Sequence, residues 1–125
     1  MATVLVIDDE ASIRENLVRF LKLEGHKAVE AADGRAGLDA VKTHAPDLIF
    51  CDVMMPHVDG FEVLATLQAD ATLRHIPFVF LSASAEPEKL QEALQQGANN
   101  YVTKPFNLAR LRDLLAELLP PNAGA

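Results

Sequence analysis

Five strand-length apolar runs alternate with segments of helical spacing, and this alternation restricts the possible folds more than any other feature. The runs are Thr3–Ile7, Lys27–Ala31, Asp47–Cys51, Pro77–Leu81 and Asn100–Val102. The first, third and fourth are almost continuously hydrophobic, as strands covered on both faces are. We therefore predict that these three lie in the middle of a parallel sheet.

The segments between the runs carry end signals that fit helices. The first helix is predicted to begin with a capping box of Ser12 and Glu15 and to stop at Gly25. The others are predicted over 34–44, from Asp59-Gly60, from Pro87 to a stop at Gly97, and from Leu108 until Pro120-Pro121. The inward stripes of the last two are predicted to be Leu90, Ala93 and Leu94, and Leu108, Leu111, Leu115 and Leu118.

Strand and helix alternate five times, which calls for right-handed crossovers and helices on both faces of the sheet. The predicted fold class is doubly wound α/β, and 125 residues suit one domain. In open sheets of this kind the active edge lies at the carboxyl ends of the strands. Functional residues are therefore expected there.

Composition excludes several classes of function. Eighteen acidic against eleven basic residues give a net charge of −7, which disfavours direct binding of nucleic acid. No run approaches the roughly 18 apolar residues that span a bilayer, so we expect no membrane association. The single cysteine, Cys51, lies in an apolar run and is expected to be a buried thiol. A reducing, cytoplasmic location follows as an expectation.

Polar side chains directly follow four of the five runs: Asp8-Asp9-Glu10, Asp52, Ser82 and Thr103-Lys104-Pro105. If the first and third strands are neighbours, the carboxylates of Asp8, Asp9 and Asp52 share one small pocket. Like charges so placed repel, and a hard divalent cation relieves the repulsion. Mg²⁺ fits best because it takes one or two carboxylates and accepts a phosphate oxygen.

Other metals fit less well. Ca²⁺ would draw more oxygens from a loop of its own, and Zn²⁺ would require histidine or thiolate. The histidines show no ligand spacing and are expected at the solvated surface: His26, His44, His57 and His75.

Lys104 and Ser82 complete a set suited to phosphoryl chemistry. A metal ion, a lysine and a hydroxyl facing Asp52 are the parts that bind and neutralise a phosphoryl group, with Asp52 as nucleophile. A purely structural alternative stays open: Lys104 pairs with Asp8 or Asp9 as a surface salt bridge, and Ser82 caps the next helix.

These residues resemble the receiver domain of two-component response regulators over most of the chain. The motifs that carry the resemblance are Val6-Ile7-Asp8-Asp9-Glu10, 52–60 (DVMMPHVDG), Leu81-Ser82-Ala83, 97–101 (GANNY) and Thr103-Lys104-Pro105-Phe106. The resemblance implies a flavodoxin-like sheet of five parallel strands in the order 2-1-3-4-5. It also implies a receiver domain over residues 1–119, with 120–125 as a tail or the start of a linker.

The resemblance implies that Asp52 accepts phosphate from a sensor histidine kinase or a histidine phosphotransfer protein. Asp9 and Asp52 would bind Mg²⁺, or alternatively Mn²⁺, directly, with the backbone carbonyl of Met54 as a third ligand and Asp8 acting through water. Lys104 and Ser82 would contact the phosphoryl group. The domain would be a switch rather than an enzyme, with intrinsic self-phosphorylation from small donors and slow self-dephosphorylation.

In the family, movement of Ser82 and a rotamer change of Tyr101 would alter the surface of the fourth helix, fifth strand and fifth helix. This surface would control a protein partner. The Lys104–Pro105 peptide bond would be cis. Asn99 and Asn100 stand where the DNA-binding branch uses acids to dimerise, so we expect a monomer.

Three alternative functions are disfavoured by the sequence. A flavodoxin-like cofactor carrier is disfavoured because no phosphate loop follows the first run and the chain has no Trp and one Tyr. A phosphatase with an aspartate nucleophile would carry an Asp-x-Asp motif, whereas Asp8 and Asp9 are adjacent. A pseudo-receiver that works without phosphate is disfavoured because every chemical position is occupied.

Overall fold

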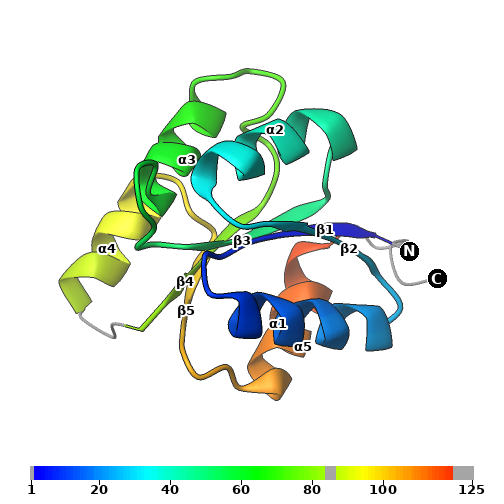
Figure 1. Ribbon diagram of the computed structural model, residues 1–125. Helices are drawn as coiled ribbons and strands as arrows, with labels where there is room; N and C mark the ends of the chain where they lie inside the picture. Colours follow the sequence, from blue (N-terminus) through cyan, green and yellow to red (C-terminus); the bar gives the residue numbers. More distant parts are fainter. Residues whose placement is uncertain (1, 84–86, 120–125) are drawn as a thin grey trace.

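The computed structural model describes residues 2–83 and 87–119. Within them, strands and helices alternate along the chain (Figure 1). They are β1 (Thr3–Ile7), α1 (Ala11–Leu23), β2 (Lys27–Ala31), α2 (Gly34–His44), β3 (Leu48–Asp52), α3 (Gly60–Gln68), β4 (Phe78–Ser82), α4 (Pro87–Gln95), β5 (Asn100–Thr103) and α5 (Leu108–Leu118). The predicted tail, 120–125, and the predicted helix end at Pro120-Pro121 lie outside the described residues.

The strands form one parallel sheet in the order β2-β1-β3-β4-β5, which confirms the predicted fold class and strand order. As predicted, β1, β3 and β4 are central, and β3 and β4 are buried along their whole length. Their continuous hydrophobicity follows from contact with helices on both faces.

The two faces of the sheet carry separate hydrophobic clusters. Alternate residues of β1 point to opposite faces, so Leu5 and Ile7 pack with α2, α3 and α4, whereas Val4 and Val6 pack with α1 and α5. Figure 1 shows the same division, with α2, α3 and α4 on one side of the sheet and α1 and α5 on the other.

The strand register brings the functional residues to one edge. Ile7 pairs with Cys51, so Asp8 and Asp52 directly follow a matched pair on neighbouring strands. Ser82 at the end of β4 pairs with Thr103, which directly precedes Lys104. Both β3 and β4 continue one residue beyond the predicted runs, and Asp52 and Ser82 are therefore the last residues of their strands.

The predicted capping box of α1 is wrong. The helix begins at Ala11, and its N-cap is Glu10, which makes no side-chain capping hydrogen bond. Ser12 therefore lies inside the first turn, where it cannot cap. The predicted helix stops are confirmed, because Gly25 and Gly97 have φ angles of +88° and +108°.

The predicted burial of four residues is also wrong. Leu90 and Leu94 are exposed because α4 buries only Ala93. Leu108 is likewise exposed, and α5 buries Leu111, Leu114 and Leu115 instead. His26 is buried, and its Nδ1 accepts a hydrogen bond from the Ala2 N–H at 3.4 Å.

Candidate functional site

Asp8, at the carboxyl end of β1, is fixed by backbone contacts. Its N–H donates to the Ala31 carbonyl at 3.1 Å, and its carbonyl accepts from Arg14 Nη1 at 2.7 Å. Its Oδ1 accepts from the Glu10 N–H at 2.9 Å, an Asx-type turn that leads the chain into α1. The side chain is fully buried, so this carboxylate is held in one orientation.

Asp52, at the end of β3, is held by the loop that follows it. The Val53 N–H donates to the Leu81 carbonyl, and the Gly60 N–H donates to the Val53 carbonyl at 2.9 Å. A Cβ at position 60 would collide with the Asp52 carbonyl oxygen. Glycine at position 60 therefore allows the first turn of α3 to pack directly against the backbone of Asp52.

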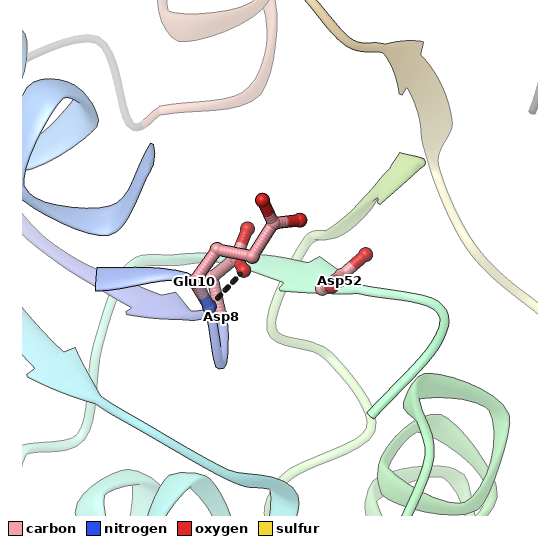
Figure 2. Close-up of side chains that lie close together, drawn as sticks. All are labelled: Asp8, Glu10 and Asp52. Carbon is pink, nitrogen blue, oxygen red and sulfur yellow. Dashed lines mark hydrogen bonds between the residues drawn. The ribbon is translucent and has the colours of Figure 1, made fainter. Parts of the chain in front are cut away.

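Three carboxylates gather at this edge of the sheet (Figure 2): one oxygen each from Asp8, Glu10 and Asp52 lies within 4.8 Å of the others. Asp9, which is also predicted to bind the cation, has an exposed side chain, as does Glu10. Asp9 still lies close enough for its charge and a hydrogen bond to affect Asp52.

Lys104 supplies the positive charge. Its Nζ lies 2.9 Å from Asp8 Oδ2, 3.3 Å from Glu10 Oε1 and 3.5 Å from Asp52 Oδ1. The structural alternative also predicted a pair with Asp8, but as a surface salt bridge. The side chain of Lys104 is 8% exposed and that of Asp8 is 0% exposed, so this ion pair is buried.

The surroundings change the proton affinity of both Asp52 and Lys104. Burial and the charge of Asp8 raise the pKa of Asp52 from 3.8 to about 7, and Asp9 adds to the rise, while Lys104 partly opposes it. Burial lowers the pKa of Lys104, but the hydrogen bond with Asp8 and the charge of Asp52 outweigh it, so its pKa is raised. One lysine therefore does not compensate the acids fully.

The residues present fit a hard divalent cation. Asp8 Oδ2 is buried and faces Lys104 Nζ at 2.9 Å, and no other donor of the described residues lies within hydrogen-bond distance of it. A buried carboxylate oxygen with unused acceptor capacity, beside two further carboxylates, is the donor set that Mg²⁺ prefers. Asp8, Asp9, Glu10 and Asp52 are the side chains available to such an ion.

The remaining predicted residues lie around this group. Ser82 is buried at the end of β4, and its carbonyl accepts from the Lys104 N–H at 2.7 Å. Tyr101 is buried on β5, in ring contact with Phe80. The Met54 side chain is exposed beside Asp52. The Lys104–Pro105 peptide bond is cis.

Two contributors were missed from the sequence. Glu10 belongs to the motif after the first strand, and its place directly after Asp8-Asp9 is the signal that points to it. Arg14 binds the Asp8 carbonyl and makes an ion pair with Glu30 at 3.1 Å. No pattern pointed to Arg14, because its partners come from the turn before α1 and from β2.

Comparison with known proteins agrees with this geometry. The model of the response regulator receiver domain matches residues 4–116. The phosphate regulon transcriptional regulatory protein PhoB of Pseudomonas aeruginosa is 34% identical over 98% of this chain and 56% of its own length. Response regulator MprA of Mycolicibacterium vanbaalenii is 38% identical over 94% of this chain and 52% of its own. The chain thus spans about half the length of these curated relatives.

Solved structures agree over nearly the whole of both chains. Chemotaxis protein CheY4 of Vibrio cholerae superposes with a TM-score of 0.89 at 35% identity, covering 95% of this chain and 99% of that one. A receiver domain from Francisella gives a TM-score of 0.87 at 31% identity, with 94% and 96% covered. Among the described residues, no helix has the length and apolar character needed to cross a membrane. The chain belongs to the response regulator receiver domain family, the phosphoacceptor domains of two-component systems.

Proposed function

We propose that Asp52 accepts a phosphoryl group from a phosphohistidine on a sensor histidine kinase or a histidine phosphotransfer protein. An oxygen of the Asp52 carboxylate forms a bond to phosphorus, and the P–N bond to the donor imidazole breaks. The electron pair of that bond stays with the imidazole, which takes up a proton. The observation that carries this proposal is a nearly buried carboxylate facing a lysine ammonium at the carboxyl edge of a receiver-type sheet.

The clustered carboxylates would hold a divalent cation that assists phosphoryl transfer. Mg²⁺, or alternatively Mn²⁺, would be held by Asp9, Asp52 and the backbone carbonyl of Met54, with Asp8 acting through water. When bound, the ion would neutralise charge on the carboxylates and on the phosphoryl oxygens. Support comes from the unused acceptor capacity of Asp8 Oδ2 and from the raised pKa of Asp52.

Lys104 and Ser82 would bind the phosphorylated state. Lys104 reaches the acids from the end of β5, and Ser82 ends the strand between β3 and β5. A phosphoryl group adds acceptor oxygens and about two negative charges, and it favours whichever conformation contacts them. Ser82 is the candidate contact to the phosphoryl group. Its movement would be followed by a rotamer change of Tyr101, and the surface of α4, β5 and α5 would change as a result.

That surface would control a protein partner. We expect no direct binding of nucleic acid by this domain, because it carries a net charge of −7. We propose a monomeric, cytoplasmic receiver domain over residues 1–119. The family match over 4–116 supports its extent, and the free, buried thiol of Cys51 is consistent with a reducing compartment.

The test is phosphorylation with acetyl phosphate and Mg²⁺, read by intact mass. One phosphoryl adduct is expected on the parent protein, and none on Asp52→Asn or after chelation of Mg²⁺. An unmodified parent, or an equal adduct on Asp52→Asn, would refute the assignment of Asp52.

A further inference from the structure

Glu10 is the outermost of the three clustered acids. Its Oε1 accepts a hydrogen bond from Lys104 Nζ at 3.3 Å, and Figure 2 shows its side chain extending over Asp8 toward Asp52. The Glu10 side chain is 56% exposed, whereas those of Asp8 and Asp52 are 0% and 7% exposed. Glu10 therefore stands where the site opens to solvent.

The Glu10 side chain does not cap α1, although the residue occupies the N-cap position. Glu10 is the N-cap residue of α1, where a side chain commonly accepts a hydrogen bond from the first turn. Its side chain makes no such bond, and its N–H is bound by Asp8 Oδ1. The carboxylate instead pairs with Lys104, a residue 94 positions further along the chain.

Lys104 can satisfy three acceptors, and the site presents three. The ammonium has three donor hydrogens, and its carboxylate partners lie 2.9, 3.3 and 3.5 Å away. A phosphoryl group on Asp52 brings new acceptor oxygens, so Lys104 must give up a partner to bind it. Glu10 is the partner most open to water, and releasing it leaves no buried charge unpaired.

We propose that Glu10 is a positioning residue that holds the Lys104 ammonium toward the mouth of the site and thereby slows phosphorylation of Asp52. This inference rests on the proposed function. In the resting protein Glu10 competes with the incoming phosphoryl group for Lys104. Once the phosphoryl group is transferred, the Glu10 carboxylate returns to water.

The test compares initial rates of phosphorylation by acetyl phosphate in the parent, Glu10→Gln and Glu10→Asp. Both variants should react about three- to fivefold faster, the effect of losing one partly exposed ion pair. Glu10→Asp keeps the charge but is one methylene shorter, so it separates the contact from the charge. Glu15→Gln, at an exposed acid on α1, removes one charge elsewhere and should match the parent.

The Mg²⁺ concentration that gives half the maximal rate is the second measurement, and it should stay within about twofold in both variants. A rise of about tenfold or more in Glu10→Gln would make Glu10 a metal ligand and overturn the proposal. Parental rates in both variants would also overturn it, as would acceleration in Glu10→Gln alone, which indicates a charge effect. Failure of the parent itself to be phosphorylated would instead refute the proposed function, and this inference with it.

Discussion

Replacing Asp52 with asparagine is expected to stabilise the metal-free protein, and by more at higher pH. The pKa of Asp52 is raised from 3.8 to about 7, so the folded protein binds a proton that the unfolded chain releases. Between these values the folded state carries more protons, and the free energy of unfolding falls as the pH rises. Asparagine carries no charge and removes this loss.

The size of the effect follows from the pKa shift. The rise of the Asp52 pKa from 3.8 to about 7 sets an upper limit of about 4 kcal/mol on the free energy involved. The site opens to solvent beside Glu10, which screens the repulsion, and the substitution also removes the 3.5 Å ion pair with Lys104. We therefore expect a gain of about 1–2 kcal/mol near pH 8 and about a third of that near pH 5.

The assay is urea denaturation followed by circular dichroism, with a chelator present, at both pH values. Asp113→Asn, at an exposed acid on α5, serves as the control for loss of one charge. Saturating Mg²⁺ should narrow the difference, because the ion binds the folded parent more tightly than the variant. An equal difference at both pH values, or a less stable variant near pH 8, would refute the reasoning.

Three further predictions concern single side chains. His57 has a φ of +68° at the centre of a tight turn closed by the Val58 N–H and the Pro56 carbonyl, so His57→Gly should raise stability by about 0.5–1 kcal/mol in thermal unfolding. Ser82→Ala should leave Asp52 phosphorylation possible but diminish the NMR shifts of residues 87–106; undiminished shifts would contradict its role. Met54→Asn should shorten the lifetime of the acyl phosphate, because an exposed apolar side chain is replaced by one that orients water; equal lifetimes would contradict this.

The sheet was predictable because strands that are buried on both faces consist almost entirely of hydrophobic residues. Thr3–Ile7 and Pro77–Leu81 contain almost no polar residue, so their central position could be inferred without the structure. The edge helix α4 was less predictable. Its leucines have core-like spacing, but a helix beside the edge strand β5 buries only Ala93, and periodicity does not report how much of a helix the sheet covers.

The site was predictable at the level of strand ends and less so at the level of atoms. Parallel strands place Asp8, Asp52 and Lys104 at one edge wherever the strand order is known. Which of two adjacent acids turns inward depends on the turn after β1. There Asp8 binds the Glu10 N–H and α1 begins at Ala11, so the side chain of Glu10 also reaches back over the site.

The order of the strands makes charge compensation depend on nearly the whole chain. Asp8 and Asp52 come from the first half of the chain, and Lys104 follows β5, the last strand in the sequence. A chain still lacking β5 would bring its acids together with no lysine between them, and their mutual repulsion would oppose early closure of that edge. Docking of β5 therefore both completes the sheet and supplies the missing countercharge.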